Sequence, residues 1–282
     1  MLSKNNWREE ALINMTTHFS TGVTNVRGKS GGTSLFSGIR QPLITGGTTP
    51  AEWAFQDDFV QFSQTSLAPW TIVDPGGSSY MLAQYPQGWL RMGDASPSAA
   101  DVSSAASEDV FQYHSLKQWW FETSIAVTDV SDLNTYVGFG ASAYADPVAV
   151  PDDGIGFSHL EDTTTIQFIS RKNGAGTSFT MLDSAAGSNY TFADSTVTTQ
   201  SATAYNMPDN NVRLGFLFQP AGTELNQTSA QYKLFLNGNI VGTQAATTVP
   251  DDLLMELKIM SESKGTNTND LFVDYVQTIQ QR

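Results

Sequence analysis

Short segments in which apolar and polar residues alternate are the feature of this sequence that most limits its fold. They occur at residues 118–127, 211–218 and 252–260. A period of two places successive side chains on opposite faces of a β-sheet. The apolar sets are Trp119, Phe121, Ile125 and Val127; Val212, Leu214, Phe216 and Phe218; and Leu253, Met255, Leu257 and Ile259. Glu122, Ser124, Glu256 and Lys258 fall on the opposite faces. This pattern predicts antiparallel sheets with one face on a core.

Turn signals separate these segments. Asn173-Gly174 and Asn237-Gly238 each lie between two strand-like runs, and Asn-Gly is a strong signal for a two-residue β-hairpin. No amphipathic segment of helical length follows residue 15, and no repeat of 20–50 residues is present. The sequence therefore predicts an all-β fold, a two-sheet antiparallel jelly-roll sandwich over residues 51–282. Its expected core includes Phe59, Trp119, Phe121, Val212, Leu214, Phe216, Leu234, Leu236, Leu257 and Val273.

Residues 1–50 differ from the rest of the chain. In residues 16–50, Gly, Ser and Thr dominate, and the few apolar residues cannot bury enough surface to fold alone. Within residues 5–15, Asn6 can cap the N-terminus of a short helix, and Glu9 stands three positions later, as in a capping box. We therefore expect an extended N-terminal arm, residues 1–50, that carries a short helix. The arm has five basic and two acidic residues, net +3, against nine basic and 26 acidic residues, net −17, in residues 51–282.

Composition excludes several classes of function. The chain has no cysteine, so it forms neither disulfides nor thiolate metal sites. A net charge of −14 disfavours binding to nucleic acid. No segment has the length and apolarity of a membrane span or the pattern of a signal peptide. We expect a protein that is assembled in a reducing cytoplasm, with no nucleic-acid and no membrane partner.

Four segments, in order, resemble the concanavalin A-like lectin/glucanase superfamily. WAFQDDFVQF (53–62) and QGWLRMGD (87–94) are similar to early strands of family-16 glycoside hydrolases. QYKLFLNGNIVGTQ (231–244) resembles a hairpin of laminin G-like modules, and LFVDYVQTIQQ (271–281) resembles the closing strand. The matches span roughly four-fifths of the chain. The resemblance implies a concanavalin A-like sandwich, and its motifs are less specific for function than for fold.

The resemblance also implies that the family's catalytic strand is altered. Family-16 enzymes carry an E-x-D-x-E strand, whose carboxylates share one face and act as nucleophile and acid. The nearest segment here, DGIGFSHLED (153–162), offers Gly154, Gly156 and Ser158 on one face. The sequence therefore predicts that this strand has no catalytic pair.

Other carboxylates do not form an evident pair. Glu161 and Asp162 are adjacent, so in a strand they would point to opposite faces. Glu256 and Glu262 lie six residues apart, too far along one strand to share a scissile bond. We therefore expect that the protein is not an enzyme.

The sequence offers two candidate metal sites. Asp274 matches the aspartate that helps bind a structural calcium ion in family-16 enzymes, with the carbonyl of Gly88 as a partner. The alternative is an exposed strand aspartate, and the sequence predicts no other cofactor. Asp146, Asp152 and Asp153 form an acidic loop whose pattern is more typical of a solvated loop than of a cation site.

The predicted sandwich resembles the jelly-roll and lectin-like sandwiches of bacteriophage decoration and fibre proteins. Together with the missing catalytic pair and the basic arm, this resemblance implies a non-catalytic structural virion protein, a bacteriophage capsid decoration or cement protein on the virion surface. The expected partner is the major capsid protein or another virion protein. Homo-oligomerisation, with a trimer favoured, would match local capsid symmetry. The arm residues expected to contact the partner are Trp7, Arg8, Leu12, Met15, Arg27, Lys29 and Arg40.

Two other functions fit the same resemblance. A carbohydrate-binding, lectin-like module would bind a surface glycan through exposed aromatic side chains, with Trp89, Trp119 and Trp120 as candidates. Tryptophans at alternating positions of a strand, however, are more typical of a core than of a sugar-binding groove. A degenerate glycoside hydrolase would need two carboxylates that converge in one cleft. An exposed Trp120 would favour the lectin, and a clustered glutamate pair would favour the hydrolase.

Overall fold

A computed structural model describes most of the chain from Glu52 onward. The described residues are 52–57, 59, 70–73, 81–82, 89–93, 101–109, 111–184, 187–196, 199–201, 204–205, 208–224, 227–263 and 269–281. The arm, its expected helix and its seven expected contact residues lie outside these ranges, as does Gly88. The expectations for them stay predictions. Within the described ranges, no helix has the length and apolarity needed to cross a membrane.

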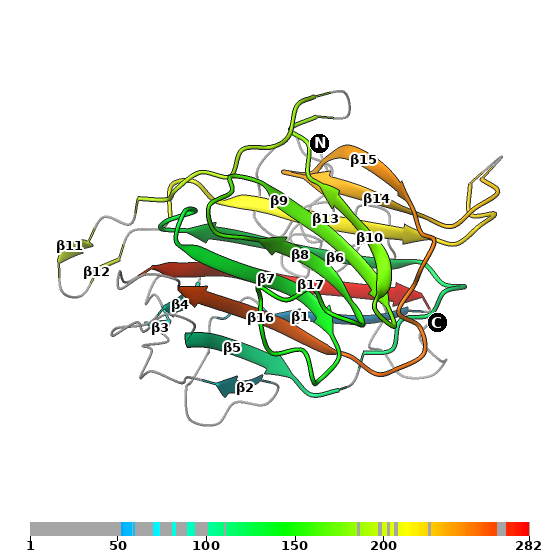
Figure 1. The fold of residues 1–282 in the computed structure, drawn as a ribbon, viewed down its shortest axis with the longest axis horizontal. Helices are drawn as coiled ribbons and strands as arrows, with labels where there is room; N and C mark the ends of the chain where they lie inside the picture. The colour runs from blue at the N-terminus through cyan, green and yellow to red at the C-terminus, as the bar shows by residue number, and fades with distance from the viewer. Residues whose placement is uncertain are drawn as a thin grey trace, which may run out of the picture.

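Two antiparallel sheets pack face to face, as Figure 1 shows. The eight-stranded sheet has the order β15 (Asn239–Ala245), β14 (Gln231–Leu236), β13 (Val212–Gln219), β6 (Trp119–Val127), β17 (Asp270–Gln281), β4 (Leu90–Gly93) and β3 (Met81–Leu82), and β1 (Glu52–Asp57) also pairs with β17. The seven-stranded sheet has the order β10 (Ala175–Thr180), β9 (Ile166–Lys172), β8 (Gly154–His159), β7 (Leu133–Gly140), β16 (Glu256–Ser263), β5 (Asp101–Ser107) and β2 (Trp70–Val73). A separate pair joins β11 (Thr199–Ser201) to β12 (Ala204–Tyr205). The predicted two-sheet antiparallel architecture is confirmed.

The core lies between the inner faces of the two sheets and is strongly aromatic. Phe121 of β6 stacks on Phe216 of β13, with ring centroids 5.6 Å apart. It also contacts Phe139 and Phe157 of the opposite sheet at 5.4 and 6.3 Å. All ten residues that the sequence assigned to the core are buried, none of them more than 4% exposed. The period-two pattern therefore identified the inner faces of β6, β13, β14 and β16 correctly.

Both predicted Asn-Gly hairpins are present. Asn173 and Gly174 have φ values of 51° and 73°, and they connect β9 to β10. Asn237 and Gly238 have φ values of 50° and 84°, and they connect β14 to β15. Positive φ at both central residues is the type I′ geometry, whose twist matches that of the flanking strands.

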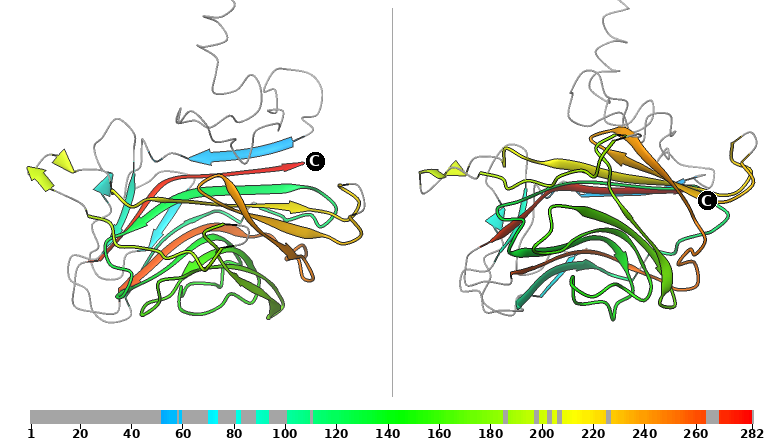
Figure 2. Two further views of the ribbon diagram at one scale, coloured as in Figure 1. Left: turned by 90° about the horizontal axis from the view of Figure 1, so that it is seen from above. Right: turned by 45° about the horizontal axis from the view of Figure 1, so that its top comes forward.

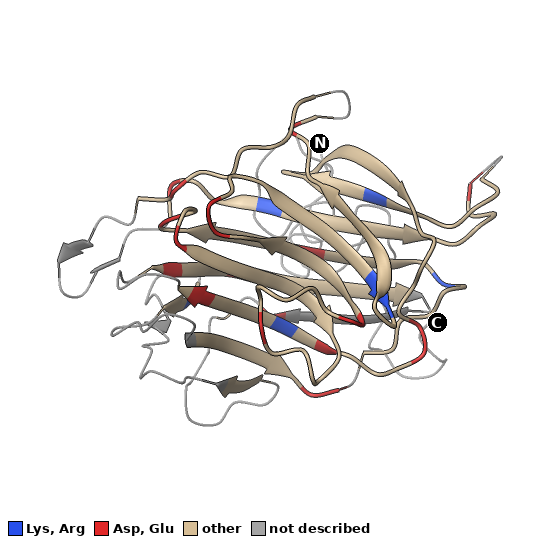
Figure 3. Cartoon of the chain, viewed as in Figure 1, with Lys and Arg blue, Asp and Glu red and all other residues tan. Residues whose placement is uncertain are grey.

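Each sheet has an outer face that points away from the core. We call the outer face of the seven-stranded sheet the front face and the outer face of the eight-stranded sheet the back face. Figure 2 shows the two sheets as stacked, curved layers. Figure 3 shows that the described Asp and Glu residues lie mainly in the loops at the two ends of the sandwich, with few on the strands. The strand faces are therefore the less charged surfaces of this acidic body.

Candidate functional site

The centre of the front face is formed by β7, β8 and β16. In the strand register, Met260 lies beside Tyr136, and Tyr136 lies beside Ser158. In the next row, Gly138 lies beside Gly156. This is the region in which the resemblance places the catalytic strand of family-16 enzymes, so we treat it as the candidate site.

Strand β8 offers no carboxylate to this face. Ile155 and Phe157 lie in the core, so the alternate positions Gly154, Gly156 and Ser158 point outward. The sequence assigned these three residues to one face, and the register confirms it. The carboxylate pattern of a family-16 catalytic strand is thus replaced by two glycines and a serine.

The two central glycines allow an aromatic ring to lie against the sheet. A Cβ atom on Gly156 would stand 2.6 Å from the carbonyl oxygen of Val137 and 3.1 Å from Cζ of Tyr136. A Cβ atom on Gly138 would stand 2.5 Å from the carbonyl oxygen of Ile155. Real Cβ atoms do not approach this closely, so both positions require glycine. The ring of Tyr136 occupies the space above Gly156.

A cluster of Tyr136, Tyr144 and Met260 fills the centre of the front face. The two tyrosine rings meet edge to face, with centroids 4.9 Å apart. The Tyr136 hydroxyl donates to the carbonyl oxygen of Phe139 at 2.7 Å, and the Tyr144 hydroxyl donates to that of Ala149 at 3.0 Å. Burial raises the pKa of both tyrosines well above its usual value, so both stay protonated at neutral pH.

A buried lysine fastens residues 141–153, the front loop, onto this cluster. Lys258 is only 4% exposed. Its Nζ donates to the carbonyl oxygens of Ser142 and Tyr144 at 3.1 and 2.6 Å, and it lies 2.8 Å from Oε2 of Glu256. The sequence pattern correctly predicted that Lys258 points away from the core. In the structure, the front loop covers it on that outer face. A buried ammonium group needs such a full set of partners.

The acidic residues of the front loop organise the loop itself. Asp146 accepts a hydrogen bond from the backbone of Val148 at 2.8 Å. Asp153 accepts one from Ala141 through its carbonyl oxygen at 3.1 Å and one from Asn173 through its carboxylate at 2.8 Å. No group of three or more Asp, Glu or His side chains within the described ranges could hold a metal ion. These contacts support a structural role for the acidic loop.

Two glutamates meet at the other end of the front face. The Asn134 side-chain nitrogen donates to Oε2 of Glu161 at 3.2 Å and to Oε2 of Glu262 at 3.4 Å. Asn134 Oδ1 in turn accepts from the backbone of Glu161 at 2.9 Å. The two carboxylate oxygens therefore lie no more than 6.6 Å apart. Glu262 is 9% exposed, and Glu161 is half-buried.

Sequence reasoning missed this pair. Closeness in the chain suggests only the pairs Glu161 with Asp162 and Glu256 with Glu262. The actual pair joins the end of β8 to β16, and the two strands reach each other only through β7. A carboxylate separation of about 5–5.5 Å is typical of retaining glycosidases, and about 6.5–9.5 Å of inverting ones. The pair is therefore a feature that a hydrolytic function could use.

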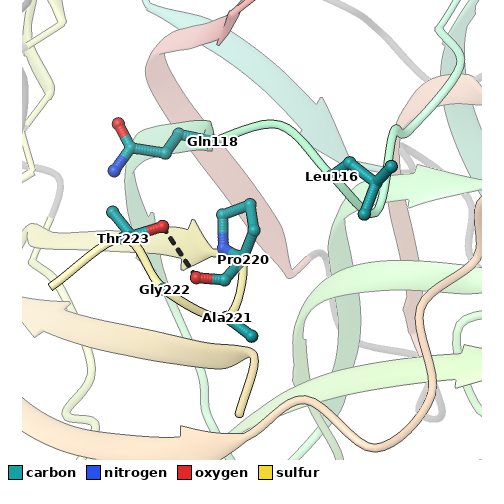
Figure 4. A pocket seen from close by; sticks show the side chains of 6 residues that line it. All are labelled: Leu116, Gln118, Pro220, Ala221, Gly222 and Thr223. Atoms are coloured by element: carbon teal, nitrogen blue, oxygen red, sulfur yellow. Dashed lines mark hydrogen bonds between the residues drawn. The ribbon is translucent and has the colours of Figure 1, made fainter. Parts of the chain in front are cut away.

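A shallow hollow of about 340 Å³ lies at one end of the sandwich (Figure 4). Its lining comes from the segment before β6 and the turn after β13: Leu116, Gln118, Pro220, Ala221, Gly222 and Thr223. The Thr223 hydroxyl is bonded to the carbonyl oxygen of Pro220 at 2.7 Å. Leu116 is 75% exposed at the rim. The lining side chains carry no charge and little fixed polarity, so the hollow offers few groups to orient a ligand.

The tryptophans considered for a sugar surface are all buried. Trp119 lies in the core, and its indole nitrogen donates to Thr278. Trp89 is 1% exposed and Trp120 is 6% exposed. Trp120 therefore lacks the exposure that would favour a lectin, although its side chain lies on the back face and not between the sheets.

Asp274 is buried, which contradicts the alternative that it is an exposed strand aspartate. It is 4% exposed and lies where the register of β17 against β6 shifts between Val273 and Tyr275. Such an irregularity turns a side chain away from its expected direction. Gly88, the expected partner, lies outside the described residues. Calcium binding at Asp274 and Gly88 stays a prediction.

No protein-family model and no curated protein sequence matches this chain. Several solved structures share its fold. The metal-free carbohydrate recognition domain of Emp46p is 10% identical, with a TM-score of 0.50, and the match covers 79% of this chain and 94% of that one. SCLam, a non-specific endo-β-1,3(4)-glucanase from family GH16, is 12% identical, with a TM-score of 0.50 and coverage of 82% and 92%. A structure described with endo-acting O-glycanases of the human gut microbiota is 10% identical, with a TM-score of 0.51 and coverage of 81% and 99%. The chain therefore has the concanavalin A-like lectin and glucanase fold, and likeness at this identity shows the fold alone.

Proposed function

We propose that this chain is a non-catalytic structural protein of a virion, a bacteriophage capsid decoration or cement protein held by its N-terminal arm. The solved neighbours include a carbohydrate recognition domain and a glucanase, so their fold serves more than one function. The charge contrast between the arm, net +3, and residues 51–282, net −17, supports attachment through the arm. The sandwich would then be the outward-facing body on the virion surface.

One observation carries the non-catalytic part of this proposal. The centre of the front face is filled by Tyr136, Tyr144 and Met260, and buried Lys258 holds the front loop over it. A polysaccharide that lay across the sheet would have to displace this cluster and break the bonds of Lys258. Gly154 and Gly156 also stand where family-16 enzymes carry carboxylates, so the filled centre of this face supports a non-catalytic role.

We expect the tip of the arm to supply most of the attachment energy. In the full chain, replacement of Trp7, Leu12 and Met15 together by alanine should weaken binding to purified virus particles at least ~100-fold, because a few large buried anchors dominate interface energy. Co-sedimentation of labelled protein with particles measures the affinity.

A matched control removes apolar side chains from the body. Val148 and Val150 of the front loop are 44% and 48% exposed, and their double alanine variant should bind particles as the unaltered chain does. Equal binding by the arm variant and the unaltered chain would show that the tip is not the anchor.

Hydrolysis or lyase chemistry is the second candidate, and the Glu161–Glu262 pair is the observation that favours it. The pair lies beside the filled centre of the front face, and Asn134 bonds both carboxylates. We expect no turnover of β-glucans, agar, mucin O-glycans or polyuronates above background, measured as release of reducing ends or unsaturated products.

The variants for this test are Glu161→Gln and Glu262→Gln, with Asp162→Asn as the control next in sequence to Glu161. Turnover that either glutamine variant abolishes and the asparagine variant retains would overturn the non-catalytic proposal. Saturable binding on a glycan array without turnover would instead support the lectin-like alternative.

A further inference from the structure

The back face carries an apolar row across three neighbouring strands. Leu217 of β13 lies beside Trp120 of β6, and Trp120 lies beside Ile279 of β17. Ile279 is in turn paired with Ala54 of the neighbouring strand β1. We call Leu217, Trp120 and Ile279 the back row. An apolar row that includes a tryptophan is not typical of a sheet face that contacts water.

Two of the three residues of the back row are buried. Trp120 is 6% exposed and Ile279 is 2% exposed, whereas Leu217 at the end of the row is half-buried. The polar neighbours in the next row, Glu122 and Gln277, are 3% and 5% exposed. Adjacent strands flank such side chains, but they cannot shield the side that points away from the sheet. Every described strand belongs to one of the two sheets or to the β11–β12 pair, so no third layer of described strands lies on this face. The cover is therefore a segment outside the described strands.

The electrostatics of the face favour a basic cover. The Tyr275 hydroxyl donates to Oε1 of Glu122 at 2.5 Å, and Arg213 Nε lies 3.9 Å from the same oxygen. Burial raises the pKa of Tyr275, and the negative charge of Glu122 raises it further. A carboxylate removed from water in this way gains from additional positive charge nearby.

The chain itself brings a segment to this place. β1 runs antiparallel to β17, and its first residue, Glu52, pairs with Gln281. Ile279, which pairs with Ala54, is also the partner of Trp120. The residues before Glu52 therefore meet the sheet at its edge, two strands from Trp120. At about 3.3 Å per extended residue, a few residues suffice to reach it.

We propose that residues 35–51 fold back over the back row in the same molecule. This segment holds two apolar pairs, Leu35-Phe36 and Leu43-Ile44, and one basic residue, Arg40. The apolar pairs would cover Trp120 and Ile279. Arg40 would add positive charge near Glu122 in place of the partner contact expected from the sequence. The arm would then be divided: residues 35–51 complete the body, and residues 1–34 remain for other contacts. This inference does not depend on the proposed function.

The absence of cysteine permits a clean accessibility test in the full chain. Gln277→Cys places a thiol on the back face, and Ile240→Cys places one at a site that is 48% exposed. We expect maleimide to label Gln277→Cys at least ~10-fold more slowly, because labelling requires the cover to open. Adding Leu43→Asp and Ile44→Asp should remove most of this protection, whereas Leu43→Ala and Ile44→Ala should remove part of it. Labelling of Ile240→Cys should be unchanged in each background, and an unchanged urea unfolding midpoint confirms that the body stays folded.

Two results would overturn the proposal. Equal labelling of Gln277→Cys and Ile240→Cys in the otherwise unaltered chain would show that the face is open. Protection that disappears on dilution, or that persists in the Leu43→Asp and Ile44→Asp background, would show that a second copy or a different segment provides the cover.

Discussion

Gly138→Ala is expected to lower the free energy of unfolding by about 3 kcal/mol or more. The added Cβ atom would stand 2.5 Å from the carbonyl oxygen of Ile155 and would also strike the Cα atom of Gly156. Both are backbone atoms of β8, so the strain cannot be relieved by moving a flexible side chain. Relief would require the two strands to separate beneath Tyr136. Urea unfolding followed by circular dichroism measures the loss.

Gly222→Ala is the matched control for this prediction. Gly222 has a φ of 80° and no atom within 4 Å of an added Cβ, so only backbone strain, about 1 kcal/mol, opposes the change. If both variants lose the same stability, the close approach of β7 and β8 at Gly138 and Gly156 does not hold in solution.

Lys258→Ala is expected to cost about 3 kcal/mol and to release the front loop. Removal of one partner from a buried, hydrogen-bonded ion pair leaves the remaining groups desolvated and unpaired. Here these groups are the carbonyl oxygens of Ser142 and Tyr144 and the carboxylate of Glu256. Urea unfolding measures the global loss. The local effect is faster chymotrypsin cleavage after Tyr144, which is 7% exposed in the intact protein.

Lys233→Ala provides the comparison on the other sheet. Lys233 pairs with Glu224, whose side chain is 46% exposed, and surface pairs of this kind contribute little. Its unfolding midpoint and the cleavage rate after Tyr144 should both stay unchanged. If Lys258→Ala leaves Tyr144 protected, the front loop is held by the tyrosine cluster and not by the lysine.

The architecture was predictable because strand periodicity is a local property of the sequence. Alternation placed Trp119 and Phe121 on an inner face, and Asn173-Gly174 and Asn237-Gly238 encoded their own turn geometry through positive φ. Both properties depend on residues within a few positions of each other. The alternation and the turn signals predict the antiparallel sheets. The four segments that resemble the concanavalin A-like superfamily, in their order along the chain, predict how the sheets are assembled.

The arrangement of the candidate site was not predictable in this way. Lys258 correctly faces outward, but its burial depends on a loop more than 100 positions earlier in the chain. Glu161 and Glu262 meet because β7 lies between β8 and β16, and nothing in the neighbourhood of either glutamate indicates the other. Period-two patterns identify which face a side chain occupies, but they do not identify the segment that lies over that face.

The burial of Trp120 and Asp274 illustrates the same limit. Both occupy strands of the eight-stranded sheet, and no pattern near either residue indicates what surrounds it outside the core. For Asp274, the shift of register after Val273 changes the direction of the side chain, and such a bulge leaves no reliable local signature in a single sequence.

Mass spectrometry of virus particles, purified on a density gradient from the source that encodes this chain, tests the central claim most directly. The account predicts that the chain is present in every particle preparation, at a constant ratio to the major capsid protein, and that it is released intact when the particles are dissociated. Absence of the chain from purified particles, together with sugar binding or polysaccharide turnover by the free protein, would contradict it.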